Sequence, residues 1–140
     1  MQPCRTTEES HIAIIEEVTV PKWLSTAAKK IFKEKAQILV NYRILSQLDL
    51  DSLAIYSMKM AEVIECEKDI RNNGTYIEVS TKNGSQLVEN PSIAIMKDDI
   101  KVINTIGCSF GFTPASRKVI ADKIDHKKEV DEFSDFEDVI

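Results

Sequence analysis

The sequence has few of the residue types that build catalytic or metal sites. Its two histidines, His11 and His126, lie near opposite ends, and its three cysteines, Cys4, Cys66 and Cys108, are widely spaced. It contains no Gly-rich phosphate loop, no Cys-x-x-Cys and no His-Glu-x-x-His pattern. We therefore expect no enzymatic activity, no cofactor, no metal and no disulfide framework.

Long apolar runs are also missing, so we expect no membrane span, and no segment has the pattern of a signal peptide. The chain has 4 Gly and 4 Pro, with 43% hydrophobic and 29% charged residues. This composition is typical of a helical globular protein, and 140 residues suffice for one domain with its own core. We expect a soluble, intracellular protein.

The net charge of −5 is unevenly distributed along the chain. Residues 1–20 carry one Arg and four Glu, residues 21–128 carry 17 basic and 13 acidic side chains, and residues 129–140 carry six acids and no base. A mildly basic body with acidic ends is typical of proteins that use interaction tails. We expect an N-terminal arm over 1–20, a helical domain over 21–128 and an acidic tail over 129–140.

Residues 22–40 have the pattern of an amphipathic helix. One side carries the apolar residues Leu24, Ala27, Ala28, Ile31 and Ile38. The opposite side carries Lys22, Lys29 and Lys33. This cationic side is either a solvated face or a surface that contacts phosphate groups.

A second helix is predicted from Asp49 or Asp51, as its N-cap, to Asn73, where Asn73-Gly74 ends it. Apolar residues along it alternate at steps close to three and four: Leu53, Tyr56, Met60, Val63 and Ile70. Because only a short link separates the two long helices, they should lie as an antiparallel hairpin.

Residues 75–88 change to the pattern of a β-hairpin, with strand formers on both sides of Lys82-Asn83-Gly84-Ser85. Two strands do not stand alone in water. The hairpin should therefore pack on the helices or pair with a neighbouring subunit, and the sequence leaves both possibilities open.

The stretch from Asn90 to Arg117 contains two sets of helix-start signals. Asn90-Pro91 should open a helix that runs to Phe110, and Gly111 should end it. Thr113-Pro114 repeats the start signal, so a shorter helix should run from Pro114 to about Ile124. Two helices therefore meet at a corner.

Two pairs of carboxylates in these helices are interpreted as surface groups. Asp98 and Asp99 are adjacent on a helix, so they point in different directions. Glu65 and Asp69 are accompanied by Lys68 and Arg71, which indicates an ordinary charged face.

The acidic tail carries apolar residues that recur mostly every three positions, among them Phe133 and Phe136. A tail that only solubilises has no need of them, so we expect one that folds on a basic, grooved partner. The fold class expected is mainly α: a helical hairpin and two further helices, with a small β-hairpin insertion and a flexible acidic tail.

The run from Asn90-Pro91 to Phe110-Gly111-Phe112-Thr113-Pro114 and Arg117 resembles the core signature of the small terminase subunits of tailed bacteriophages. An aliphatic residue is usual in that family where Phe112 stands. Upstream, Pro21-Lys22-Trp23-Leu24 resembles the opening of the family's first helix, and residues 51–74 resemble its second. The resemblance covers about residues 21–120.

The resemblance implies a non-enzymatic subunit of the viral DNA-packaging machine. Such a protein assembles into a homo-oligomeric ring, engages double-stranded viral DNA, and recruits and regulates the terminase large subunit, which carries the ATPase and nuclease. It implies the cytoplasm of an infected bacterial host.

Two sets of site residues follow from this resemblance together with the charge pattern. The candidate DNA-binding residues are Lys22, Lys29, Lys30 and Lys33, followed by Arg117, Lys118 and Lys123. The candidate residues for docking the large subunit are Phe133, Asp135, Phe136 and Glu137. For Arg117 a structural role, clamping a neighbouring helix or subunit, is the alternative.

Two other functions remain open from the sequence. One is a dimeric helical DNA-binding regulator that uses residues 114–124 as a recognition helix. The other is a protein–protein adaptor without DNA binding. Oligomeric state separates a ring from a dimer, and salt-dependent DNA binding separates both from the adaptor.

Overall fold

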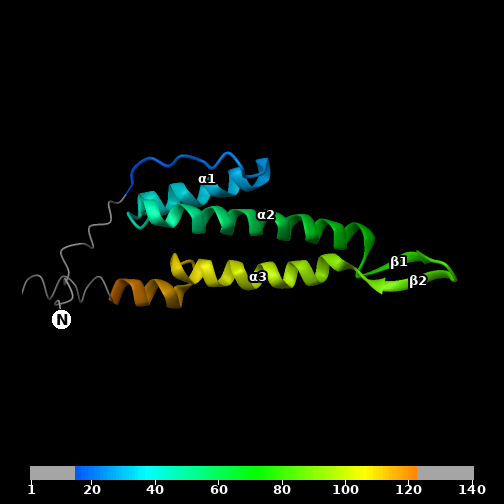
Figure 1. Ribbon diagram of the computed structural model, residues 1–140. Helices are drawn as coiled ribbons and strands as arrows, with labels where there is room; N and C mark the ends of the chain where they lie inside the picture. The colour runs from blue at the N-terminus through cyan, green and yellow to red at the C-terminus, as the bar shows by residue number, and fades with distance from the viewer. Residues whose placement is uncertain (1–14, 123–140) are drawn as a thin grey trace, which may run out of the picture. The chain divides into compact units, whose positions relative to one another are not determined.

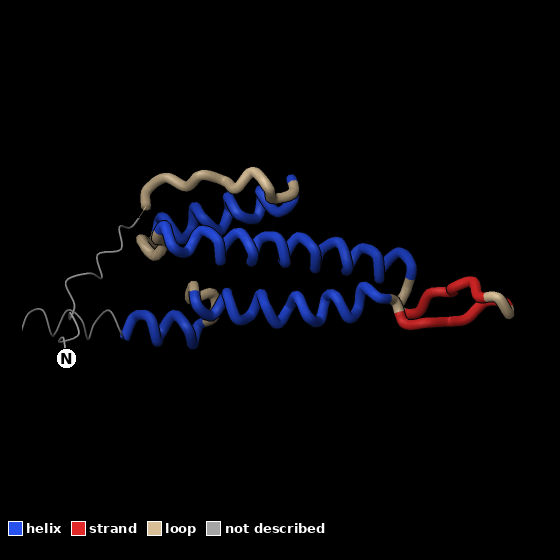
Figure 2. The backbone as a smooth tube through the Cα atoms, in the orientation of Figure 1, coloured by secondary structure: helices blue, strands red, loops and turns tan. Residues whose placement is uncertain are grey.

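The computed structural model describes residues 15–122 and consists mainly of helices, with one β-hairpin (Figures 1 and 2). The elements in chain order are α1 (Thr26–Asn41), the 3-10 helix η1 (Gln47–Asp49), α2 (Leu50–Asn73), β1 (Tyr76–Thr81), β2 (Gly84–Glu89) and α3 (Pro91–Ser109). Residues 114–122 are also helical. The chain divides into two compact units, residues 1–103 and 104–140. The expected mainly-α fold with a β-hairpin insertion is confirmed, and the tail lies outside the described residues.

The start of the first helix was predicted wrongly at Lys22. Ser25 is the N-cap of α1, because its side-chain hydroxyl accepts a hydrogen bond from the Ala28 N–H at 3.2 Å. The preceding residues form a turn in which the Leu24 N–H donates to the Pro21 carbonyl. A serine hydroxyl satisfies a backbone N–H that has no partner within the helix, and this explains why the helix begins four residues late.

The buried side of α1 also differs from the predicted one. The four residues of the helix that are buried are Ala28, Phe32, Ala36 and Leu39. Ala27 and Ile38, which were expected in the core, are exposed. Leu24 and Ala28 are buried as expected, so the prediction was right in part, and the helix has a second apolar side, with Ala27 and Ile38, that residues 15–122 leave uncovered.

Helices α1 and α2 lie side by side and run in opposite directions, as expected (Figure 1). Arg43, in the link between them, has a φ of 54° in the left-handed region. The link then turns into η1, where the Ser46 N–H and hydroxyl both donate to the Asp49 carboxylate, at 3.0 and 2.8 Å. Asp49 thus orders the link and makes no side-chain cap to α2.

Helix α2 buries residues on more than one side. Leu53, Ala54, Ser57 and Ala61 fall on one face at helical spacing, and all four are buried. Of the predicted apolar series, Leu53 and Tyr56 are buried, whereas Met60, Val63 and Ile70 are half-buried. The other side of α2 presents Lys59 and Asp69, whose partners come from residues 90–99. A central helix with two neighbours has no single apolar stripe.

The β-hairpin forms where the sequence predicts it, with its turn at Lys82 and Asn83. Tyr76 pairs with Glu89 and Thr81 pairs with Gly84 in an antiparallel ladder. Gly84 has a φ of 126°, a conformation that side chains disfavour. At the base, the Asn90 N–H donates to the Thr75 carbonyl at 2.8 Å. The chain therefore enters α3 beside the point where it left α2.

Lys59 and Asp99 join α2 to α3 through an ion pair with an N–O distance of 2.9 Å. Asp99 is only 3% exposed, and its Oδ2 atom has no hydrogen-bond partner within the described chain. The prediction that Asp98 and Asp99 are both surface groups is therefore wrong for Asp99. Adjacent residues on a helix do point in different directions, and here one of those directions leads to α2.

Lys59→Met is expected to lower the free energy of unfolding of the full chain by about 3 kcal/mol, because it leaves the Asp99 carboxylate buried without its cation. Urea denaturation followed by circular dichroism measures the change. Lys68→Met, which breaks the exposed pair with Glu65, is the control and should cost less than about 1 kcal/mol. Equal losses from the two variants would contradict a structural role for the Lys59–Asp99 pair.

Candidate nucleic-acid interface

Lys29 and Lys33 lie on the part of α1 that faces away from Ala27 and Ile38, and Lys30 lies beside that uncovered apolar side. The helix also contains Lys35 and a single acid, Glu34, so its side chains carry a net charge of about +3 at neutral pH. Within residues 15–122, Lys29, Lys30 and Lys33 form no ion pair with a carboxylate. Their charges are therefore not neutralised by ion pairs within this described range.

The remaining candidate lysines are not part of α1. Lys22 is exposed in the turn before α1 and is not part of the helix face on which it was predicted. Lys118 is exposed in the helical residues 114–122, which belong to the second unit. Lys123 lies outside the described residues, as do Phe133, Asp135, Phe136 and Glu137.

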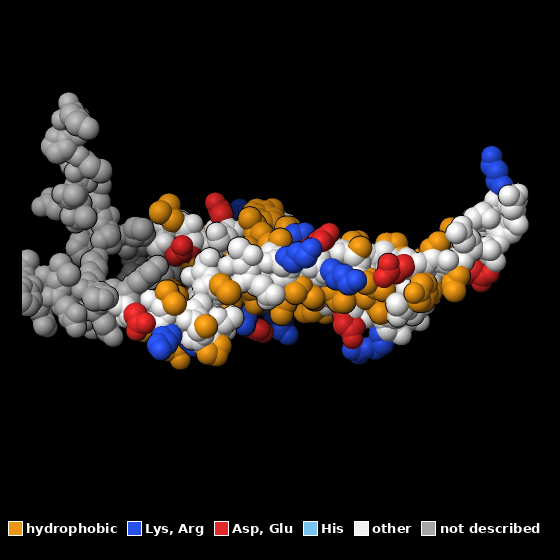
Figure 3. Space-filling view, turned by 90° about the horizontal axis from the view of Figure 1, so that it is seen from below, with side chains coloured by type: hydrophobic (Ala, Val, Ile, Leu, Met, Phe, Trp, Pro, Cys, Tyr) orange, Lys and Arg blue, Asp and Glu red, His pale blue; other side chains and the backbone are white. Residues whose placement is uncertain are grey.

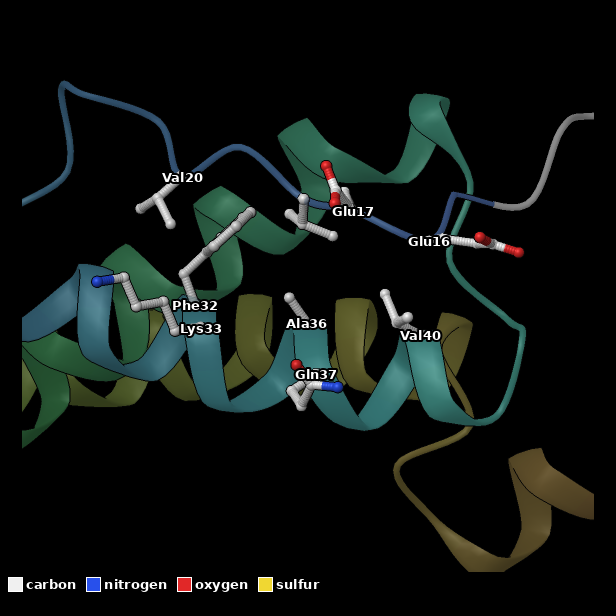
Figure 4. A pocket seen from close by; sticks show the side chains of 9 residues that line it. Glu16, Glu17, Val20, Phe32, Lys33, Ala36, Gln37 and Val40 are labelled. Carbon is white, nitrogen blue, oxygen red and sulfur yellow. The ribbon is translucent and has the colours of Figure 1, made fainter.

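A hollow of about 470 Å³ lies between α1 and the extended residues 16–20 (Figure 4). Its apolar lining includes Phe32, Ala36 and Val40, and Glu16 and Glu17 also line it. Lys33 lines the hollow as well, with its amine at the end away from Glu16 in this view (Figure 4). Two carboxylates disfavour an anion in the hollow, so phosphate contacts are better made on the open side of α1.

The corner at the end of α3 has the geometry that the sequence predicts. Gly111 has a φ of 75°, and the Phe112 N–H donates to the Gly107 carbonyl at 2.9 Å, which closes the last helical turn. The next helix begins at once, because the Thr113 hydroxyl accepts from the Ser116 N–H at 3.2 Å. Phe110 is buried and its ring stacks on that of Phe112, with 5.7 Å between the ring centroids.

Arg117 holds this corner together. Its Nη1 atom donates to the carbonyls of Gly111 and Phe112, both at 3.3 Å. A Cβ atom at Gly111 would lie 3.0 Å from the Cδ1 atom of Ile120, so the position has little room for a side chain. The geometry favours the structural role that the sequence analysis gave as the alternative for Arg117.

Asn90 organises the opposite end of α3 and is only 2% exposed. Its side-chain oxygen accepts from the Ser92 N–H at 3.0 Å and so caps the helix, as predicted. Its side-chain amide donates to the Asp69 carboxylate at 2.9 Å and to the Gly74 carbonyl at 3.1 Å. One buried amide thus joins the end of α2 to the start of α3.

Asp69 is the residue that sequence reasoning missed. Besides Asn90, its carboxylate accepts hydrogen bonds from Ser92 at 2.6 Å and from Asn73 at 2.6 Å. The bonds from Ser92, Asn90 and Asn73, in that order, lower the pKa of the Asp69 carboxyl. The interpretation of Asp69 as an ordinary surface charge was wrong. The predicted hairpin could have identified it, because pairing of the strands brings the end of α2 beside Asn90.

Residues 107–111 read Gly-Cys-Ser-Phe-Gly and therefore match the pattern Gly-x-Ser-x-Gly. The pattern indicates a hydrolase nucleophile where it forms a sharp turn between a strand and a helix. Here Ser109 is the last residue of α3, and its hydroxyl donates to the Thr105 carbonyl at 3.2 Å. The strand-to-helix turn is missing at this position, so the match does not identify a nucleophile.

Two kinds of feature are absent from the described residues: a metal-binding cluster and a membrane-spanning helix. Residues 15–122 contain no group of three or more His, Cys, Asp or Glu side chains arranged to hold a metal ion. In the same part of the chain, every helix is too short or too polar to cross a membrane.

The comparison with protein families identifies the chain. Residues 28–126 match the family described as the small subunit of phage terminase. The matched range includes the lysines of α1, the Asn90-Pro91 helix start and the corner at Gly111, and it covers more than half of the chain. The chain belongs to this family, which gives it a role in phage DNA packaging within an infected cell. Comparisons with curated proteins and with solved structures found no match.

Arg117→Gln is expected to lower the free energy of unfolding by about 1 kcal/mol, because two carbonyls lose a charged donor. Thermal denaturation measures the loss. Lys118→Gln removes the same charge from the next residue, which is exposed and has no such bond, and should leave stability unchanged. If Arg117→Gln weakens DNA binding more than Lys118→Gln and is equally stable, Arg117 contacts DNA instead of holding the corner.

Proposed function

We propose that this protein is the non-catalytic, ring-forming small subunit of a DNA-packaging terminase. It engages double-stranded viral DNA in the cytoplasm of the infected bacterium. It also recruits the large subunit and regulates the ATPase and nuclease activities of that partner. The match to the terminase small-subunit family over residues 28–126 carries this proposal, and particular features of the chain support its separate parts.

The charge of α1 supports the contact with DNA. Lys29, Lys30 and Lys33 have no carboxylate partners within residues 15–122, so binding phosphates does not require breaking ion pairs. Lysine contacts to phosphates release counterions and depend little on base sequence. This surface therefore suits binding along the DNA backbone and not readout of base edges.

The apolar residues that the chain leaves exposed support self-assembly. Ile38 of α1 is 47% exposed and lies on the same side as Ala27 and Ile31. Helix α2 exposes Ile55, Met58 and Ile64, and α3 exposes Ile95 and Ile100. Figure 3 shows apolar side chains open to solvent on one face of the helices. Exposed apolar residues on several helices are typical of subunits that are covered by further copies.

The two alternative functions, a dimeric DNA-binding regulator and a protein–protein adaptor without DNA binding, have less support. A recognition helix at 114–124 depended on Arg117 for reading bases, and its guanidinium is bound to two backbone carbonyls. An adaptor without DNA binding has no use for three neighbouring lysines that lack carboxylate partners. Salt-dependent DNA binding is the measurement that excludes the adaptor.

Lys29→Glu combined with Lys33→Glu is expected to weaken binding to double-stranded DNA without breaking the assembly. Each lost phosphate contact removes about 0.9 from the slope of log K against log salt concentration, so the double variant should reduce the slope by about two. Fluorescence anisotropy at several salt concentrations measures this slope.

Lys68→Glu combined with Lys97→Glu is the matched control, because it reverses the same number of charges on α2 and α3. Its effect on the slope should be clearly smaller. Equal affinity of the α1 variant and the wild type at low salt would contradict the assignment of DNA binding to α1.

Deletion of residues 129–140 should leave the assembly intact and abolish binding of the large subunit. The tail combines six acids with Phe133 and Phe136, and this composition suits a basic, apolar groove. Light scattering measures the assembly, and a pull-down with the purified large subunit measures binding. Phe133→Ser with Phe136→Ser keeps every charge and should give the same loss. If the truncated chain still binds the large subunit, docking uses another surface.

A further inference from the structure

The β-hairpin is not covered by the part of its own chain that the structure describes. None of residues 75–89 is buried, and Tyr76 and Leu87 are 61% and 67% exposed. The contacts of β1 are mainly those with β2, and within the described residues neither strand packs extensively on a helix. An isolated two-stranded hairpin is marginal in water, so this one needs another structure to cover it or to extend its sheet.

Both outer edges of the hairpin are open. The sheet has two strands, so each strand has one edge without a partner, where every second N–H and C=O points outward. Proteins usually protect such edges with lysine, proline or a bulge. Residues 76–81 and 84–89 contain no lysine and no proline, and their register is unbroken. Glu78 and Glu89 are the only charged side chains on the two strands, so the edges have little protection against pairing with another strand.

The composition of the hairpin disfavours nucleic acid as its partner. Residues 76–89 contain Glu78, Glu89 and Lys82, a net charge of −1. Phosphate groups would be repelled, so the hairpin is unlike a basic element that enters a groove of DNA. Apolar residues on one side of the sheet, Ile77, Val79 and Val88, favour a protein surface instead.

We propose that the hairpin is an interface between copies of this chain, in which β1 of one subunit pairs with β2 of the next. The hairpins then form one continuous antiparallel sheet through the assembly. This inference rests on the proposed self-assembly and adds the surface and the geometry by which neighbouring subunits are joined.

Cyclic symmetry makes this the natural pairing. In a ring, each copy is related to the next by rotation about the ring axis. If the strands run along this axis, every β1 points in one direction and every β2 in the other. The outer edge of β1 in one copy then meets the outer edge of β2 in the next. Because β1 and β2 are antiparallel within one hairpin, the new pair is antiparallel as well. A two-fold dimer would instead pair β1 with β1 or β2 with β2. Strand identity at the junction therefore distinguishes a ring from a dimer.

Disulfide formation between two different single-cysteine variants tests the pairing. Glu78→Cys and Leu87→Cys are made in full-length chains that carry Cys4→Ser and Cys108→Ser, with the buried Cys66 retained. Glu78 and Leu87 are paired within the hairpin, so they lie at the same height and on the same side of the sheet. Each variant carries its own affinity tag, and the two are co-expressed and then oxidised.

The mixed assembly should give a disulfide-linked heterodimer on non-reducing gels. Glu78→Cys with Gln86→Cys is the matched control and should give far less, because Gln86 lies on the opposite side of the sheet. A cross-link between Glu78→Cys and Glu89→Cys would show that β1 and the neighbouring β2 pair in a register shifted by two residues. It would also support the pairing between subunits. Cross-linking of either variant to itself, as in a two-fold dimer, would overturn the proposal.

Light scattering separates failure of this inference from failure of the proposed function. A wild-type mass of many 15.8 kDa subunits with no mixed cross-link would leave the ring intact and overturn the hairpin interface. A wild-type monomer, with and without DNA, would overturn both. Replacing residues 77–88 by two glycines should reduce the mass while circular dichroism still shows the helices. An unchanged mass of that variant would also overturn the hairpin interface.

Discussion

The hydrogen bond between Asn90 and Asp69 is the contact on which the arrangement of residues 50–103 depends. Asn90 caps α3, its backbone N–H donates to the Thr75 carbonyl, and its side-chain amide donates to the Asp69 carboxylate near the end of α2. A buried amide has to satisfy both its donors and its acceptor, and here each requirement fixes a different element. The N-cap of α3, the base of the β-hairpin and the pairing of α2 with α3 are therefore determined together. Another capping residue could begin α3, but a serine or an aspartate has no amide to donate to both Asp69 and the Gly74 carbonyl.

Polar contacts, more than apolar ones, fix α3 on α2 within the first unit. Among residues 91–103, Asp99 alone is fully buried, and it is paired with Lys59. The isoleucines around it, such as Ile95 and Ile100, remain about 40% exposed. The Asn90–Asp69 hydrogen bond and the Lys59–Asp99 ion pair, at separate points, determine how the two helices are aligned, and they do so without burying these isoleucines. That division leaves the isoleucines available to other copies of the chain, since burial against a neighbour contributes about 25 cal/mol per Å².

Local signals predicted most of the fold, and contacts between distant residues account for the errors. Asn90-Pro91, Gly111 and Thr113-Pro114 act within a few residues, and all of them have the predicted geometry. The periodicity of α1 is compatible with two apolar faces, and only packing against α2 decides which one is buried. Asp69 and Asp99 were misread for the same reason, because their partners lie 21 and 40 residues away in the sequence. Lys29, Lys30 and Lys33 lie on the helix that the sequence predicted, and their contact with DNA stays a prediction.

The exposed apolar residues of α1 and the uncovered hairpin have a common physical meaning. The sequence indicated that Ala27 and Ile38 should be buried, and that the hairpin needs a cover. The chain supplies neither within its described residues. A monomer selected to be soluble alone would have polar residues at these positions, since exposed apolar groups promote association. This pattern supports the proposed self-assembly, in which neighbouring copies would cover these residues. Lys29 and Lys33, on the other side of α1 from Ala27 and Ile38, would then stay available for the proposed contact with DNA.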